Sequence, residues 1–437
     1  MLITVFVLVL AGAGVALSRA LGGRHDRGFL VFLFVAAFGL RISFALFLTQ
    51  ILPDWVVDHP NLSLGFLGDD GRLYHQLAIR SVEAWGADRS ALPEFVAWQG
   101  ASGYILLHAL IFRVFGPDLL AMGAFNAFLG ALVPVFTYEI ARRAFSEPAA
   151  RLSALMVALY PEQIVYSGSN LKDISVTAAL MIGVWAGTRL QESGEKRHSF
   201  RHAAVLGLLG AYLALARFYL VPVLAGALLL NPGGARKGGV GGTVRRVLAV
   251  SVLLALASVL LAQIFPRSIV MFQDPVSEMS GFYGRMVRPR AGSIYALMEP
   301  PLSFIFLPFG ILLVMVTPLP LWAVLSPEPT LYVLLPGMVA WYLVLPFVAY
   351  GMWVSRGREG SARMLLFLVV GVLVLLAASG SGLVTTGRTR LPIQPLLLMF
   401  AAAGIREWLA GRRMAGVWAA GYTVAISATM MVYVWLR

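Results

Sequence analysis

The chain has 437 residues, of which 59% are hydrophobic and only 13% are charged. Soluble domains usually carry about 25% charged residues, so this composition excludes an ordinary water-soluble protein. Apolar segments near the ~20-residue length that spans a bilayer recur from end to end. We therefore predict an all-α, polytopic helical membrane protein in which residues 1–437 form a single integral membrane domain.

The net charge is +13, but the basic residues do not indicate a nucleic-acid partner. Lys and Arg concentrate in short loops, as the positive-inside rule predicts for cytoplasmic connections between membrane helices. Membrane lipids are therefore the expected surroundings. Cysteine is absent, which excludes disulfide bonds and thiolate chemistry. The first apolar run, Leu2–Ser18, follows no basic residue, so we interpret it as a retained helix rather than a cleaved signal peptide.

Six short basic loops serve as markers of the cytoplasmic side. They are Arg19–Arg27, Arg142–Arg151, Arg189–Arg201, Arg236–Arg246, Arg356–Arg363 and Arg406–Arg413. Requiring all of them to share one side of the membrane predicts about 11–13 membrane segments. The same requirement leaves two long external loops, residues 53–118 and 266–301.

The basic loops also determine the course of individual segments. Tyr104–Phe115 is too short to span, so we expect an interfacial helix along the outer surface, within the first external loop. Leu152–Val165 is predicted to run outward as one helix. Ala203–Leu230 has basic loops on both flanks, so it must form two short arms that meet near Arg217. Prolines interrupt Leu302–Leu325, which we interpret as a broken hairpin.

An acidic pair, Asp69-Asp70, follows the apolar run Gly28–Leu52 just beyond its predicted membrane exit. Two neighbouring carboxylates in this position could take a proton from a hydroxyl group, or could hold Mg²⁺ or Mn²⁺ through their oxygen atoms. Either residue could instead cap the amphipathic helix that is predicted to begin near Arg72, because Asp before a helix accepts hydrogen bonds from free backbone amides.

Several other charged residues fall on the same predicted external side. Arginine has a planar fork of donors that matches phosphate, and an ionisable residue close to a membrane segment is a functional candidate. Together with the acidic pair, they suit a substrate with a phosphate head and a lipid tail. These residues are Glu162, Lys172, Asp173, Arg217, Arg388 and Arg390.

Each of these residues also has a structural interpretation. Asp173 could cap a helix or pair with Lys172. Glu162 could bond a backbone group or pair with Arg217, which could itself hold helices together. Arg388 and Arg390 could be anchors that extend towards the membrane interface.

With these residues in place, the chain resembles the GT-C superfamily of integral membrane glycosyltransferases. The acidic pair in the first external loop matches the first acidic motif of that superfamily. Tyr160-Pro161-Glu162, followed by Lys172-Asp173, is similar to the segment that carries its second acidic position. The stretch 387–395, Gly-Arg-Thr-Arg-Leu-Pro-Ile-Gln-Pro, is similar to the arginine-bearing loop and proline-kinked helix of many bacterial members.

The resemblance implies a sugar donor linked to a polyprenyl phosphate and an acceptor hydroxyl on a lipid, glycan or protein. It implies an inverting displacement on the non-cytoplasmic face of a bacterial inner membrane. Asp69, Asp70 and Asp173 would be the catalytic acids, with Asp69 preferred as the general base. Arginine would hold the leaving phosphate, and some members use a divalent cation.

Three other functions remain open at this point. A transporter or flippase of lipid-linked saccharides would also need arginines near the membrane face, but it would place charges deep within helices, where Arg41 is the main example. An O-antigen ligase or polymerase would use the same donor but place its key residues in a late external loop. A non-catalytic scaffold would make Asp69 and Asp70 dispensable.

Overall fold

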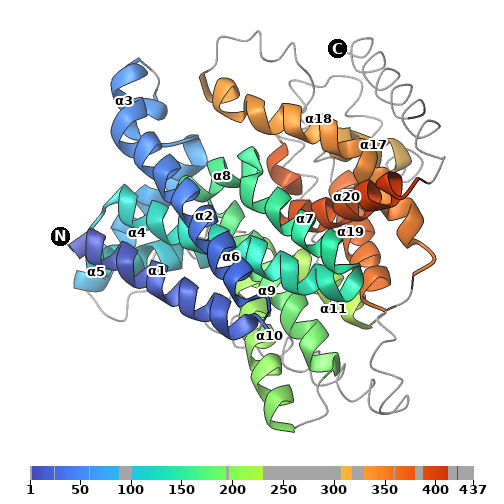
Figure 1. The fold of residues 1–437 in the computed structure, drawn as a ribbon. Helices are drawn as coiled ribbons and strands as arrows, with labels where there is room; N and C mark the ends of the chain where they lie inside the picture. The colour runs from blue at the N-terminus through green and yellow to red at the C-terminus, as the bar shows by residue number, and fades with distance from the viewer. Residues whose placement is uncertain are drawn as a thin grey trace.

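The computed structural model describes residues 2–23, 25–58, 60–87, 101–192, 196–229, 307–316, 329–358, 360–378, 387–411 and 421. Every regular element among them is a helix, and Figure 1 shows the helices assembled into one bundle. Four helical segments of this part are long and apolar enough to cross a bilayer. They are Leu2–Leu21, Arg27–Trp55, Leu119–Ala144 and Val333–Ser355. The prediction of an all-α, polytopic membrane protein is confirmed.

The number of membrane segments, about 11–13 by the positive-inside rule, stays a prediction. Segment 248–265, the second external loop 266–301 and nearly all of segment 417–435 lie outside the described residues. Of the hairpin predicted for 302–325, only α17 (Leu307–Val316) is described.

The N-terminal half of the bundle is built around α6 (Leu119–Ala144). α1 (Leu2–Leu21) and α2 (Arg27–Leu46) pack against it, and α2 continues through a π-helical turn, η1 (Phe47–Ile51), into α3 (Leu52–Trp55). The buried face of α6 carries the small residues Ala124, Ala127 and Ala131. Small side chains let helix backbones approach closely, which drives helix packing within membranes.

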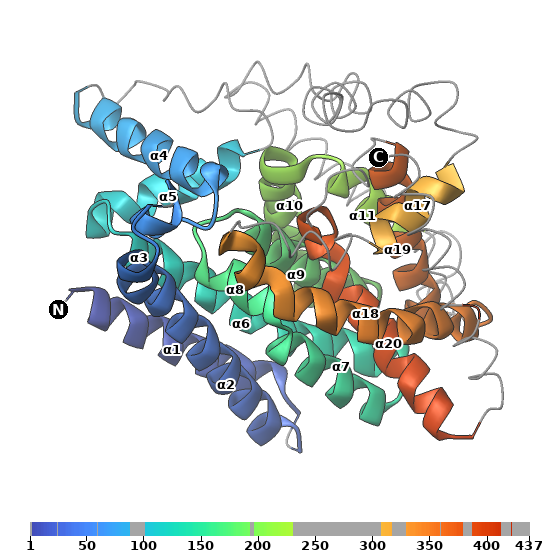
Figure 2. The ribbon, with the colours of Figure 1, turned by 90° about the horizontal axis from the view of Figure 1, so that it is seen from above.

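α4 (Asp69–Ala87) and α5 (Ser102–Phe115) belong to the first predicted external loop and pack against each other. Figure 2 shows them together at one edge of the molecule. Tyr74, Leu77, Ala78 and Ser81 of α4 are buried, and their spacing of three and four residues forms the apolar stripe of an amphipathic helix.

The segment predicted as one outward helix, 152–165, is interrupted in the structure. α7 (Glu147–Leu159) ends at Tyr160, whose backbone is extended, and α8 (Pro161–Gly168) begins directly after it. The cause is local, because Pro161 lacks an amide hydrogen and disfavours helical geometry in the residue before it. α9 (Asp173–Glu192) then returns as predicted.

Ala203–Leu230 has the predicted break beside Arg217. α10 (Lys196–Arg217) ends there, and α11 (Leu220–Leu229) starts after a two-residue turn. In the C-terminal half, α18 (Pro329–Ser355) and α20 (Gln394–Leu409) pack closely, flanked by α19 (Ser361–Ala378). A β-carbon at Gly351 or Gly404 would overlap the facing backbone.

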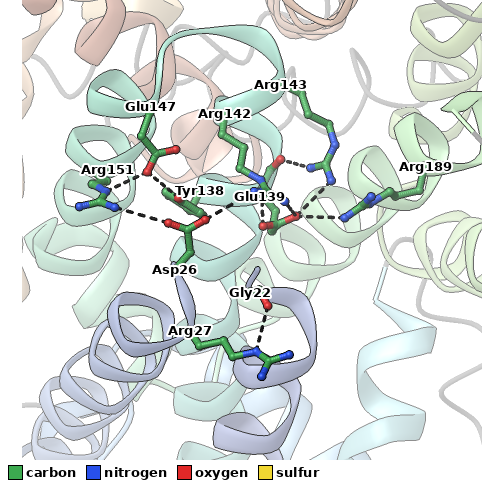
Figure 3. Close-up of polar contacts among 10 residues, drawn as sticks. All are labelled: Gly22, Asp26, Arg27, Tyr138, Glu139, Arg142, Arg143, Glu147, Arg151 and Arg189. Carbon is green, nitrogen blue, oxygen red and sulfur yellow. Dashed lines mark hydrogen bonds and ion pairs between the residues drawn. The ribbon is translucent and has the colours of Figure 1, made fainter. Parts of the chain in front are cut away.

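The C-terminal ends of α6 and α9 meet the start of α2 at one end of the bundle, and Figure 3 shows the charged residues that connect them. Glu139, fully buried near the end of α6, forms ion pairs with Arg142 at 3.0 Å, Arg143 at 3.1 Å and Arg189 of α9 at 3.4 Å. Asp26, before α2, pairs with Arg142 at 3.6 Å and Arg151 of α7 at 3.4 Å. We call Asp26, Glu139, Arg142, Arg143, Arg151 and Arg189 the basic-end cluster.

Two further basic loops reach the same end. Arg358 pairs with Glu407 at 3.1 Å, and its guanidinium lies 5.8 Å from the ring centroid of Phe145, which follows α6. Five of the six marker loops are therefore neighbours, as the requirement of a shared side predicted. The remaining loop, 236–246, lies outside the described residues.

Candidate active site

Four of the acids and arginines singled out in the sequence meet at the opposite end of the bundle, namely Asp70, Asp173, Arg217 and Arg388. Asp173 is the first residue of α9 and Arg189 lies in its last turn, and a helix of this length separates its two ends by about 30 Å. The other contributors are the start of α4, the end of α10 and a short 3₁₀ helix, η7 (Gly387–Ile393). All four positions are helix ends, where side chains can project towards a common point.

Arg388 joins the two predicted acidic positions. Its Nε lies 2.6 Å from Asp173 Oδ2, and its Nη1 lies 2.5 Å from Asp70 Oδ2. Asp173 is fully buried and also pairs with Arg217, whose Nη1 donates to the Tyr219 hydroxyl at 3.0 Å. The result is a chain of alternating charges, Asp70–Arg388–Asp173–Arg217, drawn from four distant segments.

Asp69 stands apart from this chain. Its side chain is exposed, and its Oδ1 accepts a hydrogen bond of 2.8 Å from Asn61 Nδ2. Successive residues of an α-helix point about 100° apart, so Asp69 and Asp70 face different partners. Asp70 is engaged by a guanidinium, whereas Asp69 is open to a molecule arriving from solvent.

The metal role of Asp69 and Asp70 stays a prediction. Each carboxylate already binds a different group, so the two do not present a shared set of ligands. Among the residues that the structure describes, no group of three or more His, Asp or Glu side chains could hold a metal ion. We therefore derive no chemical step through a metal.

Lys172 lies in the turn between α8 and α9, next to Asp173. Burial, reinforced by the neighbouring charge of Arg217, lowers the pKa of Lys172 to about 7. Arg388 behaves in the opposite way: although burial acts to lower its pKa, the carboxylates of Asp173 and Asp70 hold the pKa of Arg388 well above its usual value. Arg388 is thus a permanent cation, whereas Lys172 can exchange its proton near neutral pH.

Arg390 occupies a different place from Arg388. It is fully buried, with its guanidinium 3.8 Å from the ring centroid of Trp341 in α18. Its Nη1 donates to the Val314 carbonyl of α17 at 3.2 Å. Its Nη2 lies 3.9 Å from Glu162 Oε2. The predicted pair of phosphate-binding arginines is therefore divided between the site and the protein interior.

Glu162 lies in a second buried group, next to the site. Gln394 donates to its carboxylate, and Gln163 Nε2 donates to Gln394 Oε1 at 2.8 Å. Glu162 therefore pairs with residues of α20 and η7 rather than with Arg217, the partner considered from the sequence. These bonds tie α8 to the segment that carries Arg388.

Several contributing residues were not singled out from the sequence. Asn61 and Asn126 are polar residues that touch the site or its supporting turn. Asn126 could have been noticed, because a buried amide in a spanning helix needs partners. Arg41 was considered only as a deep charge. It is fully buried and donates to the Ala158 carbonyl at 2.9 Å and the Val157 carbonyl at 3.2 Å, at the end of α7.

Comparison with known proteins bears on the fold of this chain. Residues 103–266 match the family model described as dolichyl-phosphate-mannose-protein mannosyltransferase. The structure of ArnT from Cupriavidus metallidurans bound to undecaprenyl phosphate aligns with 92% of this chain at a TM-score of 0.55 and 16% identity. This chain has the GT-C fold. The resemblance found in the sequence is confirmed at the level of the fold.

Other structures carry the same GT-C architecture. ArnT in the apo state aligns with 88% of the chain at a TM-score of 0.52 and 14% identity. The Archaeoglobus fulgidus oligosaccharyltransferase in complex with Zn and sulfate aligns with 90% at a TM-score of 0.51 and 14% identity. This GT-C chain spans 64% of the undecaprenyl-phosphate-bound ArnT chain and 52% of the oligosaccharyltransferase. No curated protein matches its sequence.

Proposed function

We propose that the protein is a glycosyltransferase that moves a sugar from a polyprenyl-phosphate donor to a hydroxyl acceptor. The observation that carries the proposal is Arg388, which bridges Asp70 and Asp173 at the end of the bundle opposite to the basic-end cluster. The matched family is described by a dolichyl-phosphate donor, and the ArnT structure holds undecaprenyl phosphate. Both are phosphates on polyprenyl chains.

Arg388, Arg217 and Lys172 form the cationic part of the site. A phosphate group near them would receive charge-assisted hydrogen bonds, which are stronger than neutral ones. It would compete with Asp70 and Asp173 for Arg388, which has five N–H donors. The negative charge that develops on the leaving phosphate would be held there during transfer.

Asp69 is the proposed general base. It accepts the proton of the acceptor hydroxyl while the hydroxyl oxygen forms a bond to the anomeric carbon. The bond between that carbon and the phosphate oxygen breaks, and its electron pair leaves with the phosphate. A single displacement of this kind inverts the anomeric configuration. The exposure of Asp69 supports this role, since a base must reach the proton that it removes.

Asp70 and Asp173 are proposed to orient the cations. Asp173 is fully buried between two arginines, so its carboxylate is occupied by them. Glu162 and Arg390 are proposed to hold η7 in place through their contacts with α18, α20 and α17. In this proposal the donor phosphate contacts Arg388, whereas Arg390 stabilises the position of η7 from the protein interior.

The site is proposed to face the non-cytoplasmic side of a bacterial inner membrane. The basic-end cluster and the loops around it gather at one end of the bundle, and the positive-inside rule places such loops in the cytoplasm. The acidic and arginine residues of the site lie at the other end. A lipid-linked donor could enter there from the membrane while its headgroup stays in contact with water.

The transporter alternative is less well supported. A transporter was expected to place charged residues deep within its helices, and Arg41 was the main example. In the structure Arg41 donates hydrogen bonds to backbone carbonyls at the break between α7 and α8. These bonds give it a structural role. The ligase or polymerase alternative rests on a late external loop, and the loop 266–301 lies outside the described residues.

The test is sugar transfer by the purified protein in liposomes that contain a polyprenyl-phosphate sugar pool and lipid or glycan acceptors. Asp69→Asn should lower turnover by about 100-fold or more, because it removes the general base. Asp54→Asn is the matched control, since Asp54 is another exposed acid of the same loop. Full turnover by the Asp69 variant would refute the assigned base, and inactivity of the wild type towards every donor would refute the function.

Metal dependence is tested in the same assay. The described acids form no shared ligand set, so we expect EDTA treatment to leave turnover unchanged. Restoration by added Mg²⁺ or Mn²⁺ after a loss of activity would instead assign a divalent cation to the reaction.

A further inference from the structure

The turn that carries Lys172 and precedes Asp173 is stabilised by hydrogen bonds from a buried side-chain amide. Residues 169–172 connect the end of α8 to the start of α9, where backbone carbonyls lack helical partners. Asn126, in the apolar helix α6, donates through Nδ2 to the Ser169 carbonyl at 2.8 Å and to the Leu171 carbonyl at 3.3 Å. One side chain thus satisfies two carbonyls of the turn.

Tyr104 of α5 completes this contact. Its hydroxyl lies 3.0 Å from Asn126 Nδ2 and donates to Asn170 Oδ1 at 3.3 Å. Asn126 and Tyr104 are both fully buried. Residues 169–171 of the turn are therefore each bonded to α6 or α5. The buried positions of Asn126 and Tyr104 shield these bonds from water that could replace a lost hydrogen bond.

The same turn supports the helix that carries the acidic pair. A β-carbon at Gly71 would lie 3.3 Å from the Asn170 carbonyl oxygen, so the first turn of α4 rests directly on the turn. The rings of Tyr74 and Tyr104 also meet edge to face, with centroids 5.5 Å apart. A shift of residues 169–171 would consequently move Asp173 and the start of α4 at once.

We propose that Asn126 is a positioning residue, which holds the 169–172 turn where Arg388 can reach both Asp70 and Asp173. Among the described residues its hydrogen bonds go to the turn and to Tyr104, and none goes to the acids or to Arg388. The catalytic consequence rests on the proposed glycosyltransferase function, whereas the placement of the turn does not.

The first experiment measures the exposure of the turn without any substrate. The chain has no cysteine, so Ser169→Cys introduces a single thiol at a fully buried position. Its reaction with a water-soluble maleimide is followed in detergent-solubilised protein. Adding Asn126→Ala should raise the labelling rate by about tenfold, because a segment that loses hydrogen bonds opens more often.

Thr137→Val is the matched control for this measurement. Thr137 is another buried polar residue of α6, but its hydroxyl donates only to the Val133 carbonyl of its own helix, at 2.8 Å. Labelling at position 169 should be unchanged in that background. Equal labelling in the Asn126→Ala and Thr137→Val backgrounds would overturn the proposal.

The second experiment measures steady-state transfer. Asn126→Ala should lower kcat by about tenfold or more while the KM for the donor changes by less than about threefold, since misplaced catalytic groups act mainly on the chemical step. Tyr104→Phe should also lower kcat, but by a smaller factor. It replaces Asn126→Ala as the test variant if Asn126→Ala does not fold. Faster labelling with unchanged kcat would reject the positioning role. A wild-type chain that transfers no sugar refutes the function, while the labelling still decides whether Asn126 holds the turn.

Discussion

Arg388 and Arg390 are two residues apart, yet they have separate surroundings. The sequence placed both on the predicted external side and assigned both to phosphate. Residues of a 3₁₀ helix repeat every three positions, so side chains two apart point in different directions. In η7 this geometry turns Arg388 towards Asp70 and Asp173 and turns Arg390 towards Trp341. The shared side was predictable, whereas the partners of each arginine depended on which helices pack around η7.

Lys172 makes the proposed site sensitive to pH. With the pKa of Lys172 lowered to about 7, the free protein loses this positive charge as the pH rises through that value. An anionic donor favours the charged form, so we expect kcat/KM for the donor to fall between pH 7 and 9. Lys172→Arg should flatten this fall, because arginine keeps its charge throughout the range.

The measurement is the pH profile of kcat/KM for both proteins, with Asp54→Asn as a control that should follow the wild type. A profile that is flat in the wild type, or that falls equally in the arginine variant, would contradict the role of Lys172.

Helix breaks bring the site residues to the ends of elements. Pro161 ends α7, and the carbonyls left without partners there are taken by Arg41 of α2, which also donates through Nε to the Ser167 hydroxyl at 3.2 Å. The proline made a break foreseeable, but the length of the apolar run favoured one helix. The arginine that donates to these carbonyls lies 116 or more positions away from them in the sequence. Only the tertiary structure therefore shows the contact.

Arg41→Met should therefore destabilise the protein. It leaves at least two buried carbonyls without donors, and an unsatisfied buried group costs about 1–3 kcal/mol. Thermal unfolding in detergent is the measurement. Arg27→Met is the control, because Arg27 is exposed on the same helix and should unfold close to the wild-type temperature. Equal stability of the two variants would show that Arg41 is not needed at the break.

At the scale of the whole molecule, charge separates into two ends. The basic-end cluster connects α2, α6, α7 and α9 (Figure 3) through Glu139 and Asp26. The opposite end carries the chain of alternating charges around Arg388. The positive-inside rule predicted this separation. It did not predict that a buried glutamate would hold three arginines together.

Glu139→Gln tests the contribution of the basic-end cluster to stability. Removing one member of a buried ion pair destabilises a protein by about 3–5 kcal/mol, and the partly exposed arginines place our expectation at about 3 kcal/mol. Glu147→Gln is the control, since Glu147 is 45% exposed and such surface pairs contribute about 1 kcal/mol or less. Comparable unfolding temperatures for the two variants would refute the estimate.

The sequence alone was sufficient for the properties that depend on composition and on local order. The apolar runs required a helical membrane protein, the basic loops predicted which helix ends lie together, and the two basic loops that flank 203–230 predicted the break near Arg217. These are local effects of hydrophobicity, charge and backbone geometry. The tertiary structure was needed to show which side chains contact each other. It shows which arginine faces Asp70 and Asp173, which carbonyls accept from Arg41, and which turn Asn126 bonds. Such contacts join residues far apart in the chain, and their geometry depends on how the helices pack.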